Sequence, residues 1–514
     1  MNGAESLVRT LLGSGVRVCF TNPGTSEMHF VAALDRVPEM RPVLTLFEGV
    51  ATGAADGYAR MAGRPACTLL HLGPGLANGL ANLHNARRAA VPLVNIVGDH
   101  ATYHGLHDAP LTSDVAGFAR PVSGWVHTCT SARSAGADAA RAVQAARGAP
   151  GRIATLILPA DTAWNDADGA APALPVSGAV PVGDAAVVRA AEALRSGRRS
   201  AILLRGDALQ RTGLQAAGRV AEAAGCRLLC DTFAPRLDRG AGLVAPERIP
   251  YFAEQIVEFL GGLEILILVG SKPPVAFFAY PNRPSWVVPD GCKILCLAED
   301  FEAGPDALAR LADSLGSRPA SPAGACPARP ERPSGSLNAH TVGAAIGHLL
   351  PEGAIISDDG ATSGGGTMAG TQGCPPHTHL ALTGGAIGQG LPLAVGAAVA
   401  CPDRKVVCLS GDGSGMYTLQ ALWTMARERL DVTTVVFANR SYRILSIELG
   451  RVGAEPPGPA ALSMFDLSNP DIEWAGLGRA LGVESSRVET IEQFLDQFAL
   501  AMTSRGPRLI EVVL

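Results

Sequence analysis

Two short polar segments in the last third of the chain contain side chains that can bind a metal ion. Gly411-Asp412-Gly413-Ser414 follows the apolar run Lys405 to Ser410, and Asn439 follows a second run, Val432 to Ala438. Both runs are rich in β-branched residues, so each predicts a buried parallel strand that ends at the polar residues. A carboxylate and an amide oxygen at neighbouring strand ends are hard ligands of the kind that Mg²⁺ prefers.

A helix is expected between these two strands, because Leu419, Leu422, Trp423 and Ala426 recur at helical spacing. In a doubly wound sheet, the carboxyl ends of the strands lie beside helix N-termini, whose free N–H groups favour phosphorylated ligands. The glycines around Asp412 let the backbone approach such a ligand closely. The segment therefore predicts a site for a metal ion together with an anion.

Two further segments add candidate residues from other parts of the chain. Val43 to Phe47 predicts a strand that ends at Glu48, and Ala55-Asp56-Gly57-Tyr58-Ala59-Arg60 lies in the helix expected after it. Taken alone, a glutamate at a strand end is usually solvated. The loop Gly384-Gly385-Ala386-Ile387-Gly388-Gln389-Gly390-Leu391-Pro392 could be a dinucleotide-binding turn, but the acidic residue expected for ribose binding is missing.

Together these segments resemble the thiamine diphosphate signature of the family that includes acetolactate synthase, benzoylformate decarboxylase and pyruvate decarboxylase. The resemblance implies that Asp412, Asn439 and the Ser441 carbonyl bind Mg²⁺, although Ala438 replaces the first asparagine of the usual pair. It also implies that the Glu48 carboxyl activates the cofactor and that Ile387 supports its bent conformation. The other cofactor-binding residues that it implies are Gly411, Gly413, Ser414, Gly385, Thr362, Ser363, Tyr442 and Leu445.

Residues on the substrate side resemble benzoylformate decarboxylase. Asn22-Pro23-Gly24-Thr25-Ser26-Glu27 is similar to a turn of that enzyme, and His71 matches its active-site histidine. The resemblance implies that Thr25 and His71 handle substrate protons; the alternative for His71 is a hydrogen bond within its loop. The second catalytic histidine of that enzyme has no counterpart. Phe277, Phe278 and Tyr280 occupy its stretch, either as an apolar pocket wall or as core.

Residues that acetolactate synthases use for a second substrate are replaced here. Asp99 and Pro110 stand at two such positions, and no Arg-x-Trp pair follows Asn439. Leu445 stands where pyruvate decarboxylase has a catalytic glutamate. The overall resemblance is nearest to the short acetolactate synthase large-subunit homologues, through segments 22–35 and 44–60.

A histidine-rich segment follows Asp99 and permits several interpretations. His100, His104 and His107 could bind a metal, but their spacing is loose. An active-site loop or a surface turn fits this segment better than a zinc site. His100 and His104 could also replace the missing second histidine.

The length of 514 residues predicts about three domains. We expect an α/β fold of three doubly wound parallel-sheet domains: residues 1–165 bind the pyrimidine, 184–316 form a middle domain, and 337–514 bind the pyrophosphate. The segments Asn165 to Gly183 and Ser317 to Ser336 are rich in proline and predict linkers. Besides those above, strands are expected at Val16 to Phe20, Cys67 to His71, Leu93 to Val97, Ala201 to Leu204, Arg227 to Cys230, Ile265 to Val269 and Lys293 to Leu297.

Composition narrows the choice of partner and compartment. A net charge of −5 without a basic tract excludes a typical nucleic-acid-binding protein. The 11 cysteines lack ligand-like spacing, and neither a signal peptide nor a membrane-spanning run is apparent. We therefore expect a soluble cytoplasmic protein. The family resemblance further implies an obligate homo-oligomer, a dimer or a dimer of dimers, in which Glu48 of one subunit reaches the cofactor of another. No flavin signal is present, so FAD is not expected.

The residues favour a thiamine diphosphate- and Mg²⁺-dependent enzyme that decarboxylates a 2-oxo acid, with or without carboligation to an acceptor, as a lyase or a transferase. A site like that of benzoylformate decarboxylase is the first hypothesis. The alternatives are a true acetolactate synthase-type carboligase and a non-catalytic homologue that binds the cofactor. An NAD-dependent oxidoreductase rests on the glycine-rich turns alone and is the weakest.

Overall fold

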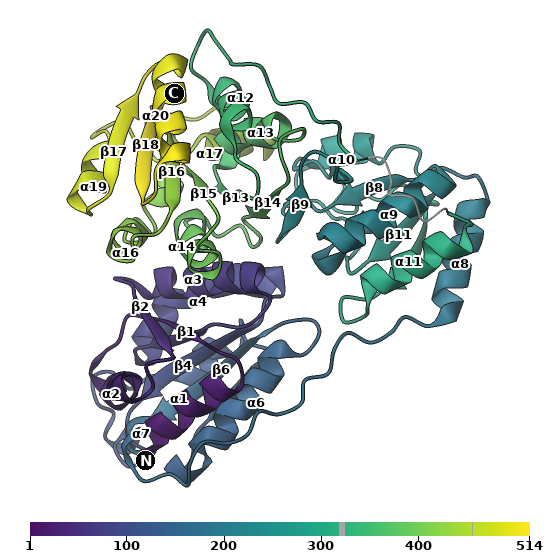
Figure 1. The fold of residues 1–514 in the computed structure, drawn as a ribbon. Coiled ribbons are helices and arrows are strands. Elements are labelled where there is room, and N and C mark those ends of the chain that lie inside the picture. The colour runs from purple at the N-terminus through teal and green to yellow at the C-terminus, as the bar shows by residue number, and fades with distance from the viewer. Residues whose placement is uncertain (318–323, 455) are drawn as a thin grey trace.

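The chain folds into three α/β lobes, each built on its own sheet (Figure 1). The computed structural model describes residues 1–317, 324–454 and 456–514. Part of the predicted linker at 317–336, namely residues 318–323, therefore lies outside the described residues. The other predicted linker, 165–183, contains no helix or strand and runs along the molecule between the first and middle lobes. The three parallel-dominated sheets confirm the predicted α/β fold.

The first sheet has six parallel strands in the order β2-β1-β3-β4-β6-β5. Helices cover both of its faces, because its strands are apolar on both sides. The strands are β1 (Val18–Thr21), β2 (Arg41–Leu44), β3 (Cys67–Leu70), β4 (Leu93–Asp99), β5 (Trp125–Thr128) and β6 (Ile153–Pro159). The helices are α1 (Gly3–Gly13), α2 (Met28–Arg36), α3 (Glu48–Ala62), α4 (Leu72–Ala89), α5 (Val115–Ala119), α6 (Ala135–Arg147) and α7 (Ala160–Trp164).

The middle sheet has five parallel strands in the order β10-β8-β7-β11-β12. Its two faces carry separate apolar cores. The strands are β7 (Ser200–Leu204), β8 (Arg227–Cys230), β10 (Glu247–Arg248), β11 (Ile265–Val269) and β12 (Lys293–Ala298). The helices are α8 (Asp184–Arg195), α9 (Arg211–Ala224), α10 (Ala253–Phe259) and α11 (Gly304–Ser314).

The last sheet has seven strands in the order β17-β18-β16-β15-β13-β14-β9. Its edge strand β9 (Leu237–Arg239) comes from the middle third of the chain and is antiparallel to β14. The other strands are β13 (Ile355–Asp359), β14 (His377–Ala381), β15 (Val406–Gly411), β16 (Val432–Ala438), β17 (Glu484–Val488) and β18 (Arg508–Val513). The helices are α12 (Ala339–Leu349), α13 (Ala361–Gly370), α14 (Gly390–Ala400), α15 (Asp412–Gly415), α16 (Ala421–Arg427), α17 (Arg443–Arg451), α18 (Pro459–Ser463), α19 (Trp474–Ala480) and α20 (Ile491–Thr503).

Helix α3 of the first lobe packs on α14 of the last, as Figure 1 shows. Two glycines allow this close approach: a Cβ on Gly57 would lie 2.1 Å from the Leu393 carbonyl oxygen, and one on Gly396 would lie 1.8 Å from the Ala54 carbonyl oxygen. Side chains of both lobes share one continuous apolar core. The contact fixes the carboxyl edge of the first sheet relative to the last lobe.

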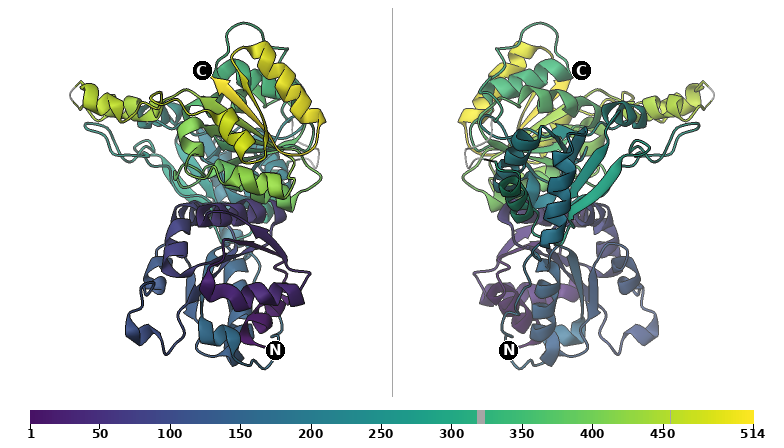
Figure 2. Two further views of the ribbon diagram at one scale, coloured as in Figure 1. Left: turned by 90° about the vertical axis from the view of Figure 1, so that its left-hand side faces the viewer. Right: turned by 90° about the vertical axis from the view of Figure 1, so that its right-hand side faces the viewer.

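Helix α17 extends away from the body of the last lobe beside a loop of the middle lobe (Figure 2). The Tyr280 hydroxyl in that loop donates a hydrogen bond to Glu448 at 2.6 Å. Arg451 forms a two-pronged ion pair with Glu254 and lies over the Phe252 ring. No residue of α17 is buried. The helix is therefore held mainly by polar contacts with the middle lobe.

The predicted strands lie where they were expected, with shifts at their ends. The largest shift is at the second strand, which was expected to run to Phe47 but ends at Leu44. Leu44 pairs with Thr21, the last residue of β1. Beyond Thr21 the chain turns at Asn22 and Pro23, so the edge strand has no neighbour to pair with. Glu48 consequently begins α3 with three residues, 45–47, between it and the end of the strand.

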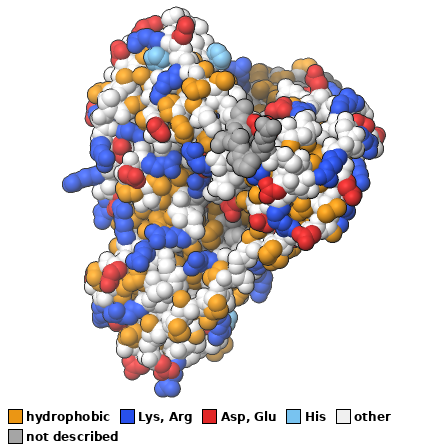
Figure 3. Space-filling view, turned by 45° about the vertical axis from the view of Figure 1, so that its right-hand side comes forward, with side chains coloured by type: hydrophobic (Ala, Val, Ile, Leu, Met, Phe, Trp, Pro, Cys, Tyr) orange, Lys and Arg blue, Asp and Glu red, His pale blue; other side chains and the backbone are white. Residues whose placement is uncertain are grey.

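Charged side chains of both signs are interspersed with apolar ones on the face seen in Figure 3. That face shows no broad basic surface, which agrees with the net charge of −5.

The cysteines in the described residues are all free. None of the described helices combines the length and apolar character needed to span a bilayer.

Candidate active site

Asp412 and Asn439 lie at the carboxyl ends of adjacent strands, as the sequence predicted. Strands β15 and β16 are parallel neighbours, with Gly411 opposite Phe437. Asp412 begins the short helix α15 directly after β15, and Asn439 follows β16. The two side chains that could bind a metal ion therefore emerge at the same edge of the last sheet.

The Asp412 carboxylate is buried, and burial raises its pKa above the usual range of an aspartate. Its oxygens accept hydrogen bonds from the Gly413 N–H at 2.8 Å and the Arg440 N–H at 2.6 Å. The Asn439 amide oxygen accepts from the Ser441 N–H at 3.0 Å. These contacts hold the oxygens in place and leave lone pairs for a cation. Hard oxygen atoms on a buried acid and its neighbour fit Mg²⁺.

Close-packed glycines beside these oxygens form a cradle with no room for a larger side chain. A Cβ on Gly413 would lie 2.3 Å from the Tyr442 ring, and one on Gly388 would lie 2.5 Å from Tyr417. Burial raises the Tyr442 pKa, so its hydroxyl is neutral near pH 7. This combination of free backbone, a helix start and hard oxygens fits a diphosphate with its metal.

The glycine-rich loop 384–390 is anchored from both sides. From the first lobe, the Asn85 amide donates to the Ala386 carbonyl at 2.8 Å, and its oxygen accepts from the Ala386 N–H at 3.2 Å. From the last lobe, the Asp359 carboxylate accepts from the Gly388 N–H at 2.7 Å. Gly385 and Gly388 have positive φ angles, which other residues rarely adopt. The loop thus presents Ile387, which is half-buried, from a rigid frame.

Asp359 is a buried acid that the sequence analysis did not single out. Burial raises its pKa to about 7, against the opposing effect of the backbone N–H donors of the loop. One of its carboxylate oxygens is buried without a hydrogen-bond partner among the described residues. Nothing in the local sequence distinguishes it from the adjacent Asp358, which instead pairs with His379.

Glu48 occupies the first turn of α3, where the helix dipole favours a negative charge. It is 6% exposed, and its carboxylate accepts a hydrogen bond from the Asn78 amide at 3.0 Å. A Cβ on Gly75 would come within 3.0 Å of the same carboxylate, so α4 closes tightly on it. Among the described residues Glu48 makes no hydrogen bond to the last lobe.

His71 lies beside a buried carboxylate at the neighbouring strand end. Its Nδ1 is 2.9 Å from Glu27, which also accepts hydrogen bonds from the Gly24 N–H and the Ser26 hydroxyl. A Cβ on Gly24 would overlap the imidazole, so the turn and the ring are packed together. Since Nδ1 must donate to the carboxylate, Nε2 is left without a hydrogen-bond partner in the described chain. Thr25 is exposed beside this pair.

The remaining predicted residues lie on the last lobe. Thr362 and Ser363 are in the first turn of α13, with Thr362 exposed and Ser363 buried. Ser414 lies buried in α15 after the Gly411 turn. Leu445 is on α17 and is 42% exposed, so it touches little of its own chain. The structure thus gathers the predicted residues at the carboxyl edges of two sheets.

The histidine-rich segment after β4 is mostly exposed. His100 and His104 have ring centroids 5.2 Å apart, and those of His104 and His107 are 5.7 Å apart. Burial raises the pKa of Asp99, which precedes them. Within the described residues no group of three or more His, Cys, Asp or Glu side chains could hold a metal ion. The structure gives no support to a zinc site here.

Besides Asp359 and Asn85, three more residues of this site had no role assigned from the sequence: Glu27, Asn78 and Gln389. Glu27 and Gln389 lay inside motifs that were noticed for other residues. The Gln389 amide donates to Asp56 at 2.5 Å, which links the glycine-rich loop 384–390 to the Asp56–Arg60 pair in α3. Asn78 lies 30 residues from Glu48 in sequence, so only the packing of α4 against α3 could reveal this contact.

Two family models match the chain. Residues 1–115 match the N-terminal TPP-binding domain of thiamine pyrophosphate enzymes, and residues 363–512 match the C-terminal TPP-binding domain. These ranges contain the predicted catalytic and metal-binding residues. The stretch between them, where the middle sheet lies, is covered by neither model.

Individual proteins resemble the chain over its full length. IlvX of Mycobacterium tuberculosis, provisionally named an acetolactate synthase large subunit, is 54% identical over 100% of this chain and 99% of its own. Benzoylformate decarboxylase of Pseudomonas aeruginosa is 28% identical over 97% of this chain and 96% of its own. The fold matches the solved thiamine diphosphate-dependent 4-hydroxybenzoylformate decarboxylase of Rhodococcus jostii RHA1 with a TM-score of 0.87 at 22% identity, over 99% and 98% of the two chains.

The paired strand-end oxygens, the glycine cradle and the buried Glu48 agree with these matches. The 54% identity over the whole chain shows the family directly, and the two TPP-binding domain matches name its cofactor. The chain belongs to the thiamine pyrophosphate enzymes, within the group of acetolactate synthases and benzoylformate decarboxylases.

Proposed function

We propose that this protein is a thiamine diphosphate- and Mg²⁺-dependent decarboxylase of a 2-oxo acid, with a site like that of benzoylformate decarboxylase. The observation that carries this proposal is the His71–Glu27 pair, with a separation of 2.9 Å, at the sheet edge beside Thr25. An imidazole with one nitrogen fixed and the other unpartnered suits proton transfer to or from a substrate. The fragment that remains after loss of CO₂ would either take up a proton and leave as an aldehyde or form a bond to an acceptor.

Different residues of the chain would bind the metal, bind the diphosphate and transfer protons. Asp412, Asn439 and the Ser441 carbonyl would hold Mg²⁺, and the first turn of α13 with Gly411, Gly413 and Ser414 would hold the diphosphate. Glu48 would hold a proton on the pyrimidine ring of the cofactor. Bound thiamine diphosphate would supply an electron sink for the carbon that loses CO₂. His71 Nε2 would then deliver or accept the substrate proton, and the exposed Thr25 hydroxyl would orient the substrate.

We also propose that the active enzyme is a homo-oligomer. Apolar side chains are exposed on both halves of the site, including Leu46 at 44%, Met416 at 38% and Tyr417 at 55%. A second subunit placed against them would bury this apolar surface. Glu48 would then face the cofactor held by the last lobe of the partner subunit. The free cysteines support a cytoplasmic location.

The direct test is incubation of the purified protein with thiamine diphosphate, Mg²⁺ and a panel of aromatic, branched and short 2-oxo acids. CO₂ release and the carbonyl product are measured, and a second aldehyde or 2-oxo acid is added to reveal carboligation. We expect turnover of at least one acid and its loss in Glu48→Gln, which still binds the cofactor. Cofactor binding without any turnover would instead favour a non-catalytic homologue.

Mixing two inactive variants tests whether the site is shared between subunits. Glu48→Gln retains the metal ligands, and Asp412→Ala retains the glutamate. If each site combines Glu48 of one subunit with Asp412 of another, subunit exchange in the mixture creates some intact sites and restores part of the activity. If both residues act within one chain, the mixture stays inactive, and the shared site is rejected.

A further inference from the structure

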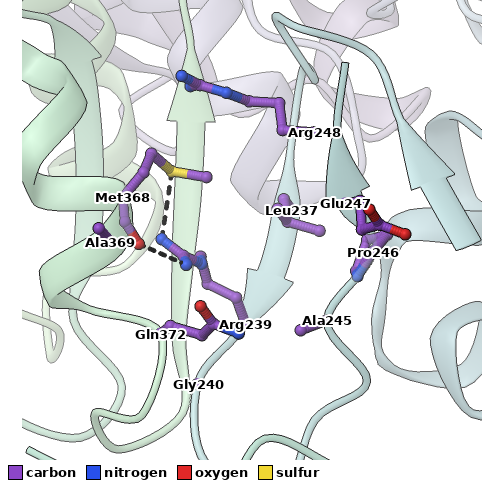
Figure 4. A pocket seen from close by; sticks show the side chains of 10 residues that line it. All are labelled: Leu237, Arg239, Gly240, Ala245, Pro246, Glu247, Arg248, Met368, Ala369 and Gln372. Carbon is purple, nitrogen blue, oxygen red and sulfur yellow. Dashed lines mark hydrogen bonds between the residues drawn. The ribbon is translucent and has the colours of Figure 1, made fainter. Parts of the chain in front are cut away.

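A cavity of about 280 Å³ lies between the middle and last lobes, away from the residues assigned to the cofactor. Figure 4 shows Arg239 and Arg248 in its lining, with the Arg239 guanidinium bonded to Met368 and with Pro246 and Glu247 on the other side. Arg239 belongs to β9, Arg248 to β10, and Met368 to the C-terminal half of α13. The cavity therefore joins elements of two sheets and the helix whose other end carries Thr362 and Ser363.

Arg239 is a buried cation without an acidic partner among the described residues. Its side chain donates to the Thr371 hydroxyl at 2.9 Å and to the Met368 carbonyl at 2.8 Å, both of which are neutral. Burial lowers its pKa to about 10, and the charge of Arg248 acts in the same direction. A buried charge without a counter-ion is costly. His377, directly opposite on β14, cannot serve as one, because an imidazole is either neutral or positively charged.

Arg248 is exposed at the same cavity, and its side chain forms no hydrogen bond or ion pair with any described residue. The acids nearby are already engaged. Glu247 is held by both prongs of Arg227 at 2.9 and 2.8 Å, and Asp358 is bonded to His379 and the Gly360 N–H. Two guanidinium groups therefore line a cavity whose one lining carboxylate, Glu247, is already paired with Arg227. An added anion would neutralise their charges.

We propose that this cavity binds a small organic monophosphate, with Arg239 and Arg248 as its counter-ions. Two positive charges match a phosphate dianion, and guanidinium groups offer the planar pairs of donors that phosphate accepts. The apolar part of the lining, Leu237, Ala245, Pro246, Met368 and Ala369, would contact a small organic body. A volume of about 280 Å³ is at the lower end for small-molecule pockets, so a dinucleotide is too large.

The test is calorimetric titration of phenyl phosphate and of inorganic phosphate into full-length protein saturated with thiamine diphosphate and Mg²⁺, which keeps the diphosphate site filled. We expect saturable binding of one phosphate ester per chain. Arg248→Gln should weaken it by about 10-fold or more, the loss typical of a charged hydrogen bond. Arg189→Gln is the matched control, because Arg189 is exposed on α8 of the same lobe and away from the cavity.

Arg239→Gln should also weaken binding, with folding checked by circular dichroism. Because Arg239 ties β9 to α13, this variant could fail to fold, and Arg248→Gln then decides the matter. The proposal is overturned if the wild type shows no saturable binding, or if Arg248→Gln binds as tightly as Arg189→Gln. Tighter binding of acetate than of phosphate at equal ionic strength would overturn the choice of phosphate.

Discussion

The imidazole of His71 and the carboxylate of Glu27 are joined at 2.9 Å, from two turns that follow neighbouring strands of the first sheet. Glu27 is 3% exposed and accepts three hydrogen bonds, so it has a fixed position. Fixing one nitrogen of the ring determines which nitrogen is available to a substrate.

Glu27→Ala should reduce kcat by about 10- to 100-fold, part of the 10²- to 10⁴-fold that a proton-transferring group contributes. The imidazole would lose the acceptor that orients it, so kcat should fall more than KM rises. Glu27→Gln, which retains an acceptor oxygen, should recover part of the loss. Steady-state kinetics on the best 2-oxo acid provides the measurement. An unchanged kcat in Glu27→Ala would show that the pair is only structural.

Asp412→Ala should lose bound Mg²⁺ and with it most of the thiamine diphosphate. The carboxylate is the only charged group among the three expected ligands, and removing it leaves neutral oxygens for a divalent cation. Metal and cofactor content after gel filtration provide the measurement. Asp403→Ala, in the exposed turn before β15, should retain both. Equal cofactor content in the two variants would place the metal elsewhere.

Arg60→Met should lower stability by about 3–5 kcal/mol, the usual cost of leaving one charge of a buried pair. The Asp56 and Arg60 side chains are 0% and 1% exposed and form a two-pronged pair at 2.7 Å. Arg60 also donates hydrogen bonds to the Pro235 carbonyl and to the Ala381 carbonyl at the end of β14. These bonds connect the first lobe to the rest of the chain. Thermal unfolding gives the effect. Arg198→Met, which breaks an exposed pair with Glu264, should shift the midpoint far less.

Because of Asp359, the free energy of unfolding should fall as the pH rises towards neutrality. Its pKa in the folded chain is about 7, above the ordinary aspartate value of 3.8, so between these pH values the folded chain holds a proton that the unfolded chain has released. Its stabilising contribution is therefore complete at low pH and lost as pH rises through 7. The neutral Asp359→Asn variant lacks this change. As the pH rises from 5 to 8, the midpoint temperature of unfolding of Asp359→Asn should rise relative to that of the wild type. If the difference between the two midpoints stays constant over this range, the buried ionisation of Asp359 is contradicted.

The sequence by itself determined the parallel α/β class and predicted that Asp412 and Asn439 lie at one edge of the last sheet. The runs Lys405 to Ser410 and Val432 to Ala438 are apolar on both faces, which requires a covered parallel strand. A parallel strand delivers its next residue to the carboxyl edge, so the placement of Asp412 and Asn439 followed from strand order and from the family resemblance. Glu48 was singled out by its motif, although the strand before it ends three residues earlier than predicted.

Only the tertiary structure decided which groups form hydrogen bonds with the predicted site residues and which side chains are desolvated. Glu27 with His71, Asn78 with Glu48, and Gln389 with Asp56 are contacts between segments far apart in the sequence, and local periodicity carries no information about them. The raised pKa of Asp359 and the unpaired charge of Arg239 arise from burial, which is a property of the packed lobes. The sequence gives the type of each side chain. Its desolvation and its hydrogen-bond partners depend on which surfaces come into contact when the sheets and helices pack.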